Sequence, residues 1–261
     1  MPNEIDIRQL QTISELEEVQ LVEKSVWNMI PIPIHQTFTA LNNGGIILGA
    51  YKENKMIGFL YSFAGCDGKN SYLCSHMLGI LPSYRKNGIG LKMKYKQAKL
   101  AKEYGYSIIT WTFDPLQSIN AYLNLQKLGA VGAFYSENYY GEMEDKLNAG
   151  LPSDRIHIQW DLNKKNEHRY LSFDSNRVLL DVKDDTPFIT SVFMNSFPEK
   201  KGPWFIAIPN EFRKIKQRNT RLALKWRLKT RKVFQALFSA NYQAYGVYRD
   251  KLNQLNYYLF M

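Results

Sequence analysis

Apolar and polar positions recur along the chain with the spacings of both strands and helices. Strands are predicted where apolar residues alternate or run together between turn residues: 5–10, 46–51, 56–63, 72–81, 108–112, 131–135 and 156–160. Helices are predicted where apolar residues recur every three or four positions: after residue 14, at 91–104 and at 120–130. An antiparallel meander followed by alternating helices and strands indicates an α+β fold with a mixed sheet.

The first helix has a recognisable start. Ser14 can cap it, and Glu17 stands three residues later, as in a capping box. Leu16, Val19 and Val22 then mark an apolar face. We therefore predict that the helix begins at Ser14.

The strand at 72–81 leads into a glycine-containing loop. Arg85-Lys86-Asn87-Gly88-Ile89-Gly90 follows a turn at Pro82 and opens the helix at 91–104. A strand, a glycine loop and a helix place backbone N–H groups and a helix N-terminus around a phosphate. No Gly-Lys-Ser/Thr follows, so the loop is not a P-loop, and it lacks the full dinucleotide fingerprint. From spacing alone, a turn that needs glycine for steric reasons remains an equal interpretation.

At these residues the chain resembles the GNAT superfamily of acyl-CoA-dependent N-acyltransferases. Arg85, Gly88 and Gly90 match that family's Arg/Gln-x-x-Gly-x-Gly/Ala signature. A second match lies downstream, in the strand 108–112 and a helix that ends in Lys127-Leu128-Gly129. Further runs at 111–117, 140–143 and 151–155 resemble one poorly characterised branch that includes putative amino-acid N-succinyltransferases. The resemblance implies acyl transfer from acetyl-CoA or succinyl-CoA to an amine, by direct attack in a ternary complex.

The resemblance also implies where the coenzyme binds. Its pantetheine would lie along Leu78, Gly79 and Ile80, at the end of the strand. Its pyrophosphate would lie on Arg85, Lys86, Asn87, Gly88, Ile89 and Gly90. The family usually has Asn at the position of Ser118, so Asn120 is the candidate to replace that contact.

Candidates for proton transfer and acceptor binding follow in the same way. His76, on the strand where many family members carry a Glu, is the candidate general base, since imidazole titrates near neutral pH. The family's usual acid Tyr is replaced by Leu125, and Tyr122, one helical turn earlier, is the candidate acid. The alternative for His76 is a half-buried histidine bonded to a neighbouring strand, and the alternative for Tyr122 is an aromatic side chain of the core.

The acceptor site is expected beside the first helical region. Trp27 and His35 would line one wall, although core packing is the favoured role for Trp27. Arg155 could bind a carboxylate of the acceptor or of a succinyl group. It could also form a structural ion pair with Asp154.

A charged linker at 163–169 separates two differently charged parts. We predict a GNAT-like domain at 1–162 and a smaller C-terminal α+β part at 170–261. That part has strands at 178–182, 188–193, 204–208, 244–249 and 255–260 and one long helix. Its order is compatible with a degenerate second GNAT repeat or with an extension of the first sheet. The formal net charge is +10, and the excess lies in the second part, notably at 213–232.

Composition excludes several function classes. Two cysteines make no disulfide framework, and four scattered histidines indicate no metal site. No apolar run has the length of a membrane span, so we expect a cytoplasmic protein without a membrane partner. Two other functions remain open: a non-catalytic acyl-CoA sensor, because of Leu125, and a basic nucleic-acid-binding protein. The second is less expected, since no base-reading motif is present. The sequence does not indicate the oligomeric state.

Overall fold

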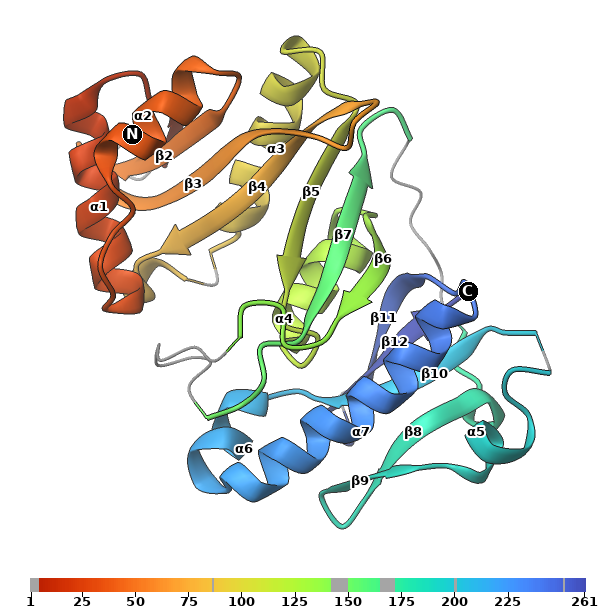
Figure 1. Cartoon of the computed structure of the whole chain (residues 1–261). Helices are drawn as coiled ribbons and strands as arrows, with labels where there is room; N and C mark the ends of the chain where they lie inside the picture. Colours follow the sequence, from red (N-terminus) through yellow and green to blue (C-terminus); the bar gives the residue numbers. More distant parts are fainter. Residues whose placement is uncertain (1–4, 86, 142–149, 165–171, 200, 251) are drawn as a thin grey trace. The chain divides into compact units, whose positions relative to one another are not determined.

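The computed structural model describes residues 5–85, 87–141, 150–164, 172–199, 201–250 and 252–261 (Figure 1). The chain forms two compact units. The first contains Met1–Trp111 and Asp161–Lys165, and the second contains Thr112–Trp160 and Asn166–Met261. Both combine helices with β-sheet, so the predicted α+β class is confirmed. These units are compact parts of the chain, and they are not a test of the predicted boundary at 163–169. That boundary and the second GNAT repeat stay predictions.

The first unit is built on a mixed sheet in the order β1-β2-β3-β4-β5. The strands are β1 (Asp6–Gln9), β2 (Ile46–Lys52), β3 (Lys55–Cys66), β4 (Ser71–Ile80) and β5 (Ile108–Phe113), whose last two residues belong to the second unit. Neighbours pair antiparallel up to β4, and β4 pairs parallel with β5. The tight β2–β3 turn has positive φ at Glu53 and Asn54. The meander predicted from alternation is therefore present.

The helices of this unit's described residues are α1 (Ile13–Trp27), α2 (Ile34–Asn42) and α3 (Ile89–Glu103). The predicted cap at Ser14 is wrong. Thr12 caps α1, and Glu15 completes the capping box. The Thr12 hydroxyl accepts from the Glu15 N–H, while the Glu15 carboxylate accepts from the Thr12 N–H. Both Ser/Thr-x-x-Glu patterns, Thr12-x-x-Glu15 and Ser14-x-x-Glu17, are present in the sequence, and the helix uses the earlier one.

Among its described residues, the second unit has strands in the order β7-β6-β11-β12-β10-β8-β9. They are β6 (Val131–Ser136), β7 (Arg155–Asp161), β8 (Val178–Lys183), β9 (Thr186–Ile189), β10 (Trp204–Pro209), β11 (Ala244–Asp250) and β12 (Leu255–Phe260). Trp204 to Pro209 are all buried, as expected of a strand inside a sheet. The predicted strand at 188–193 is partly wrong, since β9 ends at Ile189 and a short helix, α5 (Ser191–Asn195), follows.

The helices of this unit also differ from the prediction. The segment at 120–130 forms α4 (Ser118–Ala121) and then a π-helical stretch at Tyr122–Lys127. The single long basic helix is divided at Asn219 into α6 (Phe212–Arg218) and α7 (Thr220–Ser239). The Asn219 side chain caps α7 by accepting from the Leu222 N–H. Short 3-10 turns lie at Pro82–Tyr84 and Ser175–Arg177. Among the described helices, none has both the length and the apolarity that crossing a membrane requires.

Two buried ion pairs join α7 to other parts of its unit. Arg231 donates to both oxygens of Asp154, from Nη2 at 2.7 Å and from Nε at 3.0 Å. Asp154 is fully buried and also accepts from the Asn138 N–H and the Tyr135 hydroxyl. Arg227 donates to Asp114 at 2.8 Å. Burial disfavours the Asp114 carboxylate, but Arg227 holds the pKa of this group below its ordinary value.

We expect Asp154→Ala to lower the free energy of unfolding by about 3–5 kcal/mol, because it leaves the Arg231 guanidinium largely buried beside unsatisfied donors. Urea denaturation measures the change. The matched control is Glu211→Ala, which removes the exposed partner of Lys214 and should cost less than about 1 kcal/mol. Equal losses in the two variants would contradict the structural role of Asp154.

Candidate functional site

An extra residue interrupts the pairing of β4 with β3. Ser75 lies opposite Ser62, and Met77 lies opposite the adjacent residue, Tyr61. Two steps along β4 therefore match one step along β3, and His76 is the inserted residue. This is the register of a β-bulge, a device that bends a strand and changes the direction of its side chains.

The bulge determines which face of β4 each side chain occupies. Before it, the Ser75 hydroxyl contacts α3. After it, Leu78 and Ile80 lie on that same face, because they are the side chains nearest to Gly90 of α3. His76 instead lies beside the rings of Tyr61 and Phe63, with centroids 6.0 and 5.8 Å away.

His76 has the solvent access and the electrostatic setting of a neutral base. Its side chain is exposed, and the adjoining protein atoms remove part of its hydration. This desolvation lowers the pKa of the imidazole below its ordinary value of 6.5. The neutral form, which can accept a proton, is therefore favoured at neutral pH.

The glycine loop ends in an open helix N-terminus. Gly88 is the N-cap of α3, with φ at +71°, and a Cβ built on it would meet no atom within 4 Å. A side chain would strain this left-handed backbone and fill the space from which a ligand reaches the N–H groups. Arg85 is exposed, and its Nε donates to the Ile80 carbonyl at 3.0 Å. Asn87 is exposed and Ile89 is buried, while Lys86 lies outside the described residues.

Trp27 packs on β4 itself. A Cβ on Gly79 would lie 2.9 Å from the Trp27 ring and 2.8 Å from the Phe59 ring, so glycine is needed there. The Trp27 and Phe59 rings meet edge to face, with centroids 5.8 Å apart. Trp27 is thus a partly buried packing residue beside Gly79. His35 lies on α2 and is exposed.

Three predicted site residues belong to the second unit. Asn120 is exposed on α4. Tyr122 follows it, and the Arg249 guanidinium covers its ring with Cζ 3.4 Å from the centroid. Arg155 begins β7, is only 7% exposed, and donates from Nη1 to the Asp154 carbonyl at 3.0 Å. Leu125 is 1% exposed, which places it in the core.

Sequence reasoning missed Lys94. Lys92, Lys96, Lys99 and Lys102 of α3 are exposed. Lys94 is only 4% exposed. Its spacing from Met93 and Gln97, both buried, is the signal that could have found it, because it lies within the stripe that faces the sheet.

Lys94 is buried against polar and aromatic groups. Its Nζ donates to the Ser75 hydroxyl at 2.8 Å and lies 3.7 Å from the centre of the Trp111 ring. The Gln97 amide also donates to Ser75, at 3.0 Å. Among the described residues, no carboxylate forms an ion pair with Lys94. Burial therefore lowers the pKa of this amine from 10.5 to about 7.

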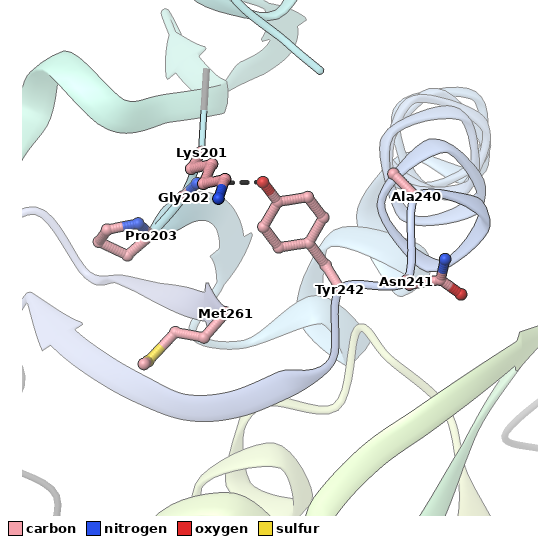
Figure 2. A pocket seen from close by; sticks show the side chains of 7 residues that line it. All are labelled: Lys201, Gly202, Pro203, Ala240, Asn241, Tyr242 and Met261. Atoms are coloured by element: carbon pink, nitrogen blue, oxygen red, sulfur yellow. Dashed lines mark hydrogen bonds between the residues drawn. The ribbon is translucent and has the colours of Figure 1, made fainter. Parts of the chain in front are cut away.

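A separate pocket of about 390 Å³ lies in the second unit (Figure 2). Its lining residues are Lys201, Gly202, Pro203, Ala240, Asn241, Tyr242 and Met261. The Gly202 N–H donates to the Tyr242 hydroxyl at 3.0 Å, so two of the lining residues are hydrogen-bonded to each other. None of the predicted site residues lines this pocket. Within the described part of the chain, no three His, Cys, Asp or Glu side chains are grouped so that they could hold a metal ion.

The unpaired Lys94 predicts a distinct pH dependence of stability. Unfolded protein binds more protons than folded protein between pH 7 and 10.5, the folded and ordinary pKa values. The stability of the wild type should therefore rise with pH in this window, by about 1.4 kcal/mol per unit. Lys94→Met removes that slope. Urea denaturation of the two proteins across this pH range measures the difference, and identical slopes would contradict a depressed lysine pKa.

Comparison with known proteins agrees with this geometry. The model of the acetyltransferase (GNAT) family matches residues 10–129. The *Escherichia coli* ribosomal-protein-S18-alanine N-acetyltransferase has a similar structure, with a TM-score of 0.50, 15% identity and coverage of 64% of this chain and all of that chain. No curated protein has a matching sequence.

Two other solved structures are similar at lower scores. *Arabidopsis thaliana* Naa50, in complex with a bisubstrate analogue, is 14% identical, with a TM-score of 0.47 and coverage of 59% of this chain and 97% of that one. A GNAT family acetyltransferase from *Elizabethkingia anophelis*, with acetyl-CoA bound, is 17% identical, with a TM-score of 0.44 and coverage of 60% and 97%.

The matched region carries the features on which the site depends. It contains the bulged β4, the glycine loop, α3 and the helical segment that follows β5. Residues 10–129 therefore match the GNAT acetyltransferase family, and this match supports an acyltransferase that acts on amino groups.

Proposed function

We propose that the protein transfers an acetyl or succinyl group from coenzyme A to the amine of a small molecule, such as an amino acid. The transfer is direct, within a ternary complex of enzyme, thioester and amine. The observation that carries this proposal is the bulged strand β4, which leads into an open, glycine-capped N-terminus of α3. A helix N-terminus offers unsatisfied N–H groups to the pyrophosphate of the coenzyme.

Each part of the coenzyme has candidate partners. The N–H groups at Gly88, Ile89 and Gly90 receive the pyrophosphate, and exposed Arg85 adds a positive charge. Lys86 and Asn87, in the same loop, are also proposed to bind the pyrophosphate. The pantetheine lies along the backbone of Leu78, Gly79 and Ile80, and its thioester then reaches the bulge at His76. Asn120 provides a further contact to the coenzyme.

The chemistry requires that the acceptor ammonium lose a proton before it attacks the thioester. His76 is the proposed base, because its imidazole is exposed at the bulge and largely neutral near pH 7. Tyr122 remains the candidate acid from sequence. The acceptor lies near Trp27 and His35, and Arg155 is the candidate partner of a carboxylate on the acceptor or on a succinyl group.

One observation favours a second function, a non-catalytic acyl-CoA sensor. Leu125 occupies the position of the acid Tyr that is usual in the family, and it is buried. A sensor binds acyl-CoA without releasing free thiol in the presence of any amine. Thiol release during an amine screen with acetyl-CoA and succinyl-CoA separates the two functions and identifies the acyl group.

Gly88→Trp should abolish binding of acetyl-CoA, since the indole occupies the approach to the helix N-terminus. Native mass spectrometry or calorimetry measures the affinity. The matched control is Gly68→Trp, at a turn glycine that also has positive φ and no atom within 4 Å of a built Cβ. Both variants strain the backbone, but only the first should lose affinity. Equal affinities in the two variants would mean that the loop is only a turn.

His76→Gln should lower kcat/KM about 10²–10⁴-fold, the usual contribution of a general base. In the wild type, activity should fall with acid only below pH 6.5, because desolvation lowers the pKa of His76 and the neutral form is the active one. A pH profile of kcat/KM measures both effects. His157→Gln, at another histidine with a lowered pKa, is the control and should keep the wild-type profile. An unchanged rate in His76→Gln would exclude His76 as the base.

A further inference from the structure

Lys94, Ser75, Gln97 and Trp111 form a buried cluster, here called the Lys94 cluster. It lies next to the proposed site of reaction and has no role in the function described above. Ser75, which accepts hydrogen bonds from Lys94 and Gln97, immediately precedes the bulge residue His76. It shares a face of β4 with Leu78 and Ile80. The proposed path of the pantetheine runs along these residues toward the bulge. Ser75 is therefore the polar side chain on that face closest to the expected position of the sulfur.

Packing alone does not account for a lysine at this position. Burying an amine without a carboxylate partner costs stability, and an apolar side chain of similar length would fill the same space. Gln97 already donates to the Ser75 hydroxyl, so Lys94 is not needed to satisfy that oxygen. A buried, unpaired titratable group beside a reaction site is characteristic of proton transfer.

The reaction has a step that needs a proton. When the amine attacks the thioester carbonyl, the C–N bond forms, the C–S bond breaks and the sulfur leaves as a thiolate. A thiol has an ordinary pKa of about 8.5, so an ammonium group that titrates near neutral pH gives its proton to a thiolate favourably. Leu125 has no proton to give.

We propose that Lys94 supplies, through the Ser75 hydroxyl, the proton that neutralises the sulfur of coenzyme A as the thioester breaks. This inference rests on the proposed function. The Ser75 O–H proton moves to sulfur while a Lys94 N–H proton moves to the Ser75 oxygen. The acceptor nitrogen loses its two protons to His76 and from there to solvent, and Lys94 regains one proton from solvent through Ser75. Ser75 contacts the reacting sulfur, and Lys94 acts through it.

Among the groups of the Lys94 cluster and their neighbours, Lys94 is the one that gains or loses a proton near neutral pH. Cys74 of β4 is its titratable neighbour, and burial raises the pKa of that thiol, which stays protonated near neutral pH. The side chains that contact Lys94 or Ser75 from α3 and β5, Gln97 and Trp111, carry no charge. The supply of protons should therefore decline as pH rises through the titration of Lys94.

The test uses the whole chain and free coenzyme A, so it does not depend on knowing the acceptor. Thiolate absorbance of bound coenzyme A is titrated in the wild type, in Lys94→Met and in the control Lys99→Met, which changes an exposed lysine of the same helix. In the wild type and the control, the bound thiol should titrate at lower pH than free coenzyme A, because the thiolate and the Lys94 ammonium, coupled across Ser75, each favour the charged form of the other. In Lys94→Met this shift should disappear while affinity for coenzyme A is retained.

Kinetics provide the second measurement, with the amine found in the screen. Lys94→Met should lower kcat about 10²–10⁴-fold with an unchanged KM for acyl-CoA, and the alkaline decline of kcat should vanish. Lys94→Arg keeps the charge but cannot release its proton, so it should not restore the rate. Ser75→Ala should lower kcat as Lys94→Met does.

The outcomes separate the two proposals. If the wild type binds and turns over acyl-CoA but Lys94→Met retains kcat and the thiol shift, the role of Lys94 is overturned and the proposed function stands. If the bound thiol titrates alike in wild type and Lys94→Met, the role is also overturned. If the wild type does not bind coenzyme A, both proposals fail.

Discussion

One extra residue in β4 determines how the first unit presents its side chains. Without the bulge at His76, strict alternation from Ser75 would place Met77 toward α3 and Leu78 away from it. With the bulge, Leu78 and Ile80 join Ser75 on the α3 face, and His76 lies beside the rings of Tyr61 and Phe63. The bulge thus separates Ser75, which binds Lys94, from the end of β4 that leads into the glycine loop, and it places His76 on a different side of the strand from Ser75.

Buried cations are accommodated in two different ways. Arg227 and Arg231 cannot lose their charge in a protein, and each is paired with an aspartate inside its unit. Lys94 has no such partner among the described residues, and its amine can become neutral near pH 7. The arginines therefore stabilise a fold, while the lysine retains a proton that can move.

Sequence patterns predicted local structure correctly where only one structure fitted the pattern, and less well where two structures fitted it equally. The glycine loop was placed correctly because a positive φ before a helix requires glycine at Gly88. The start of α1 was misplaced because Thr12 and Ser14 offer the same capping pattern, and the structure uses the earlier one. The strand expected at 188–193 gave way to a helix after Ile189, because an apolar run of that length suits either structure.

The sequence by itself determined most of the strands and helices, the position of the glycine loop and the family to which they point. These depend on periodicity and on residues that are adjacent in the chain. Only the tertiary structure decided the environment of Lys94 and Ser75, 19 positions apart, and the partners of Arg231 and Asp154, 77 positions apart. Burial and pKa arise from groups that folding brings together, and such distances in sequence carry no local signal.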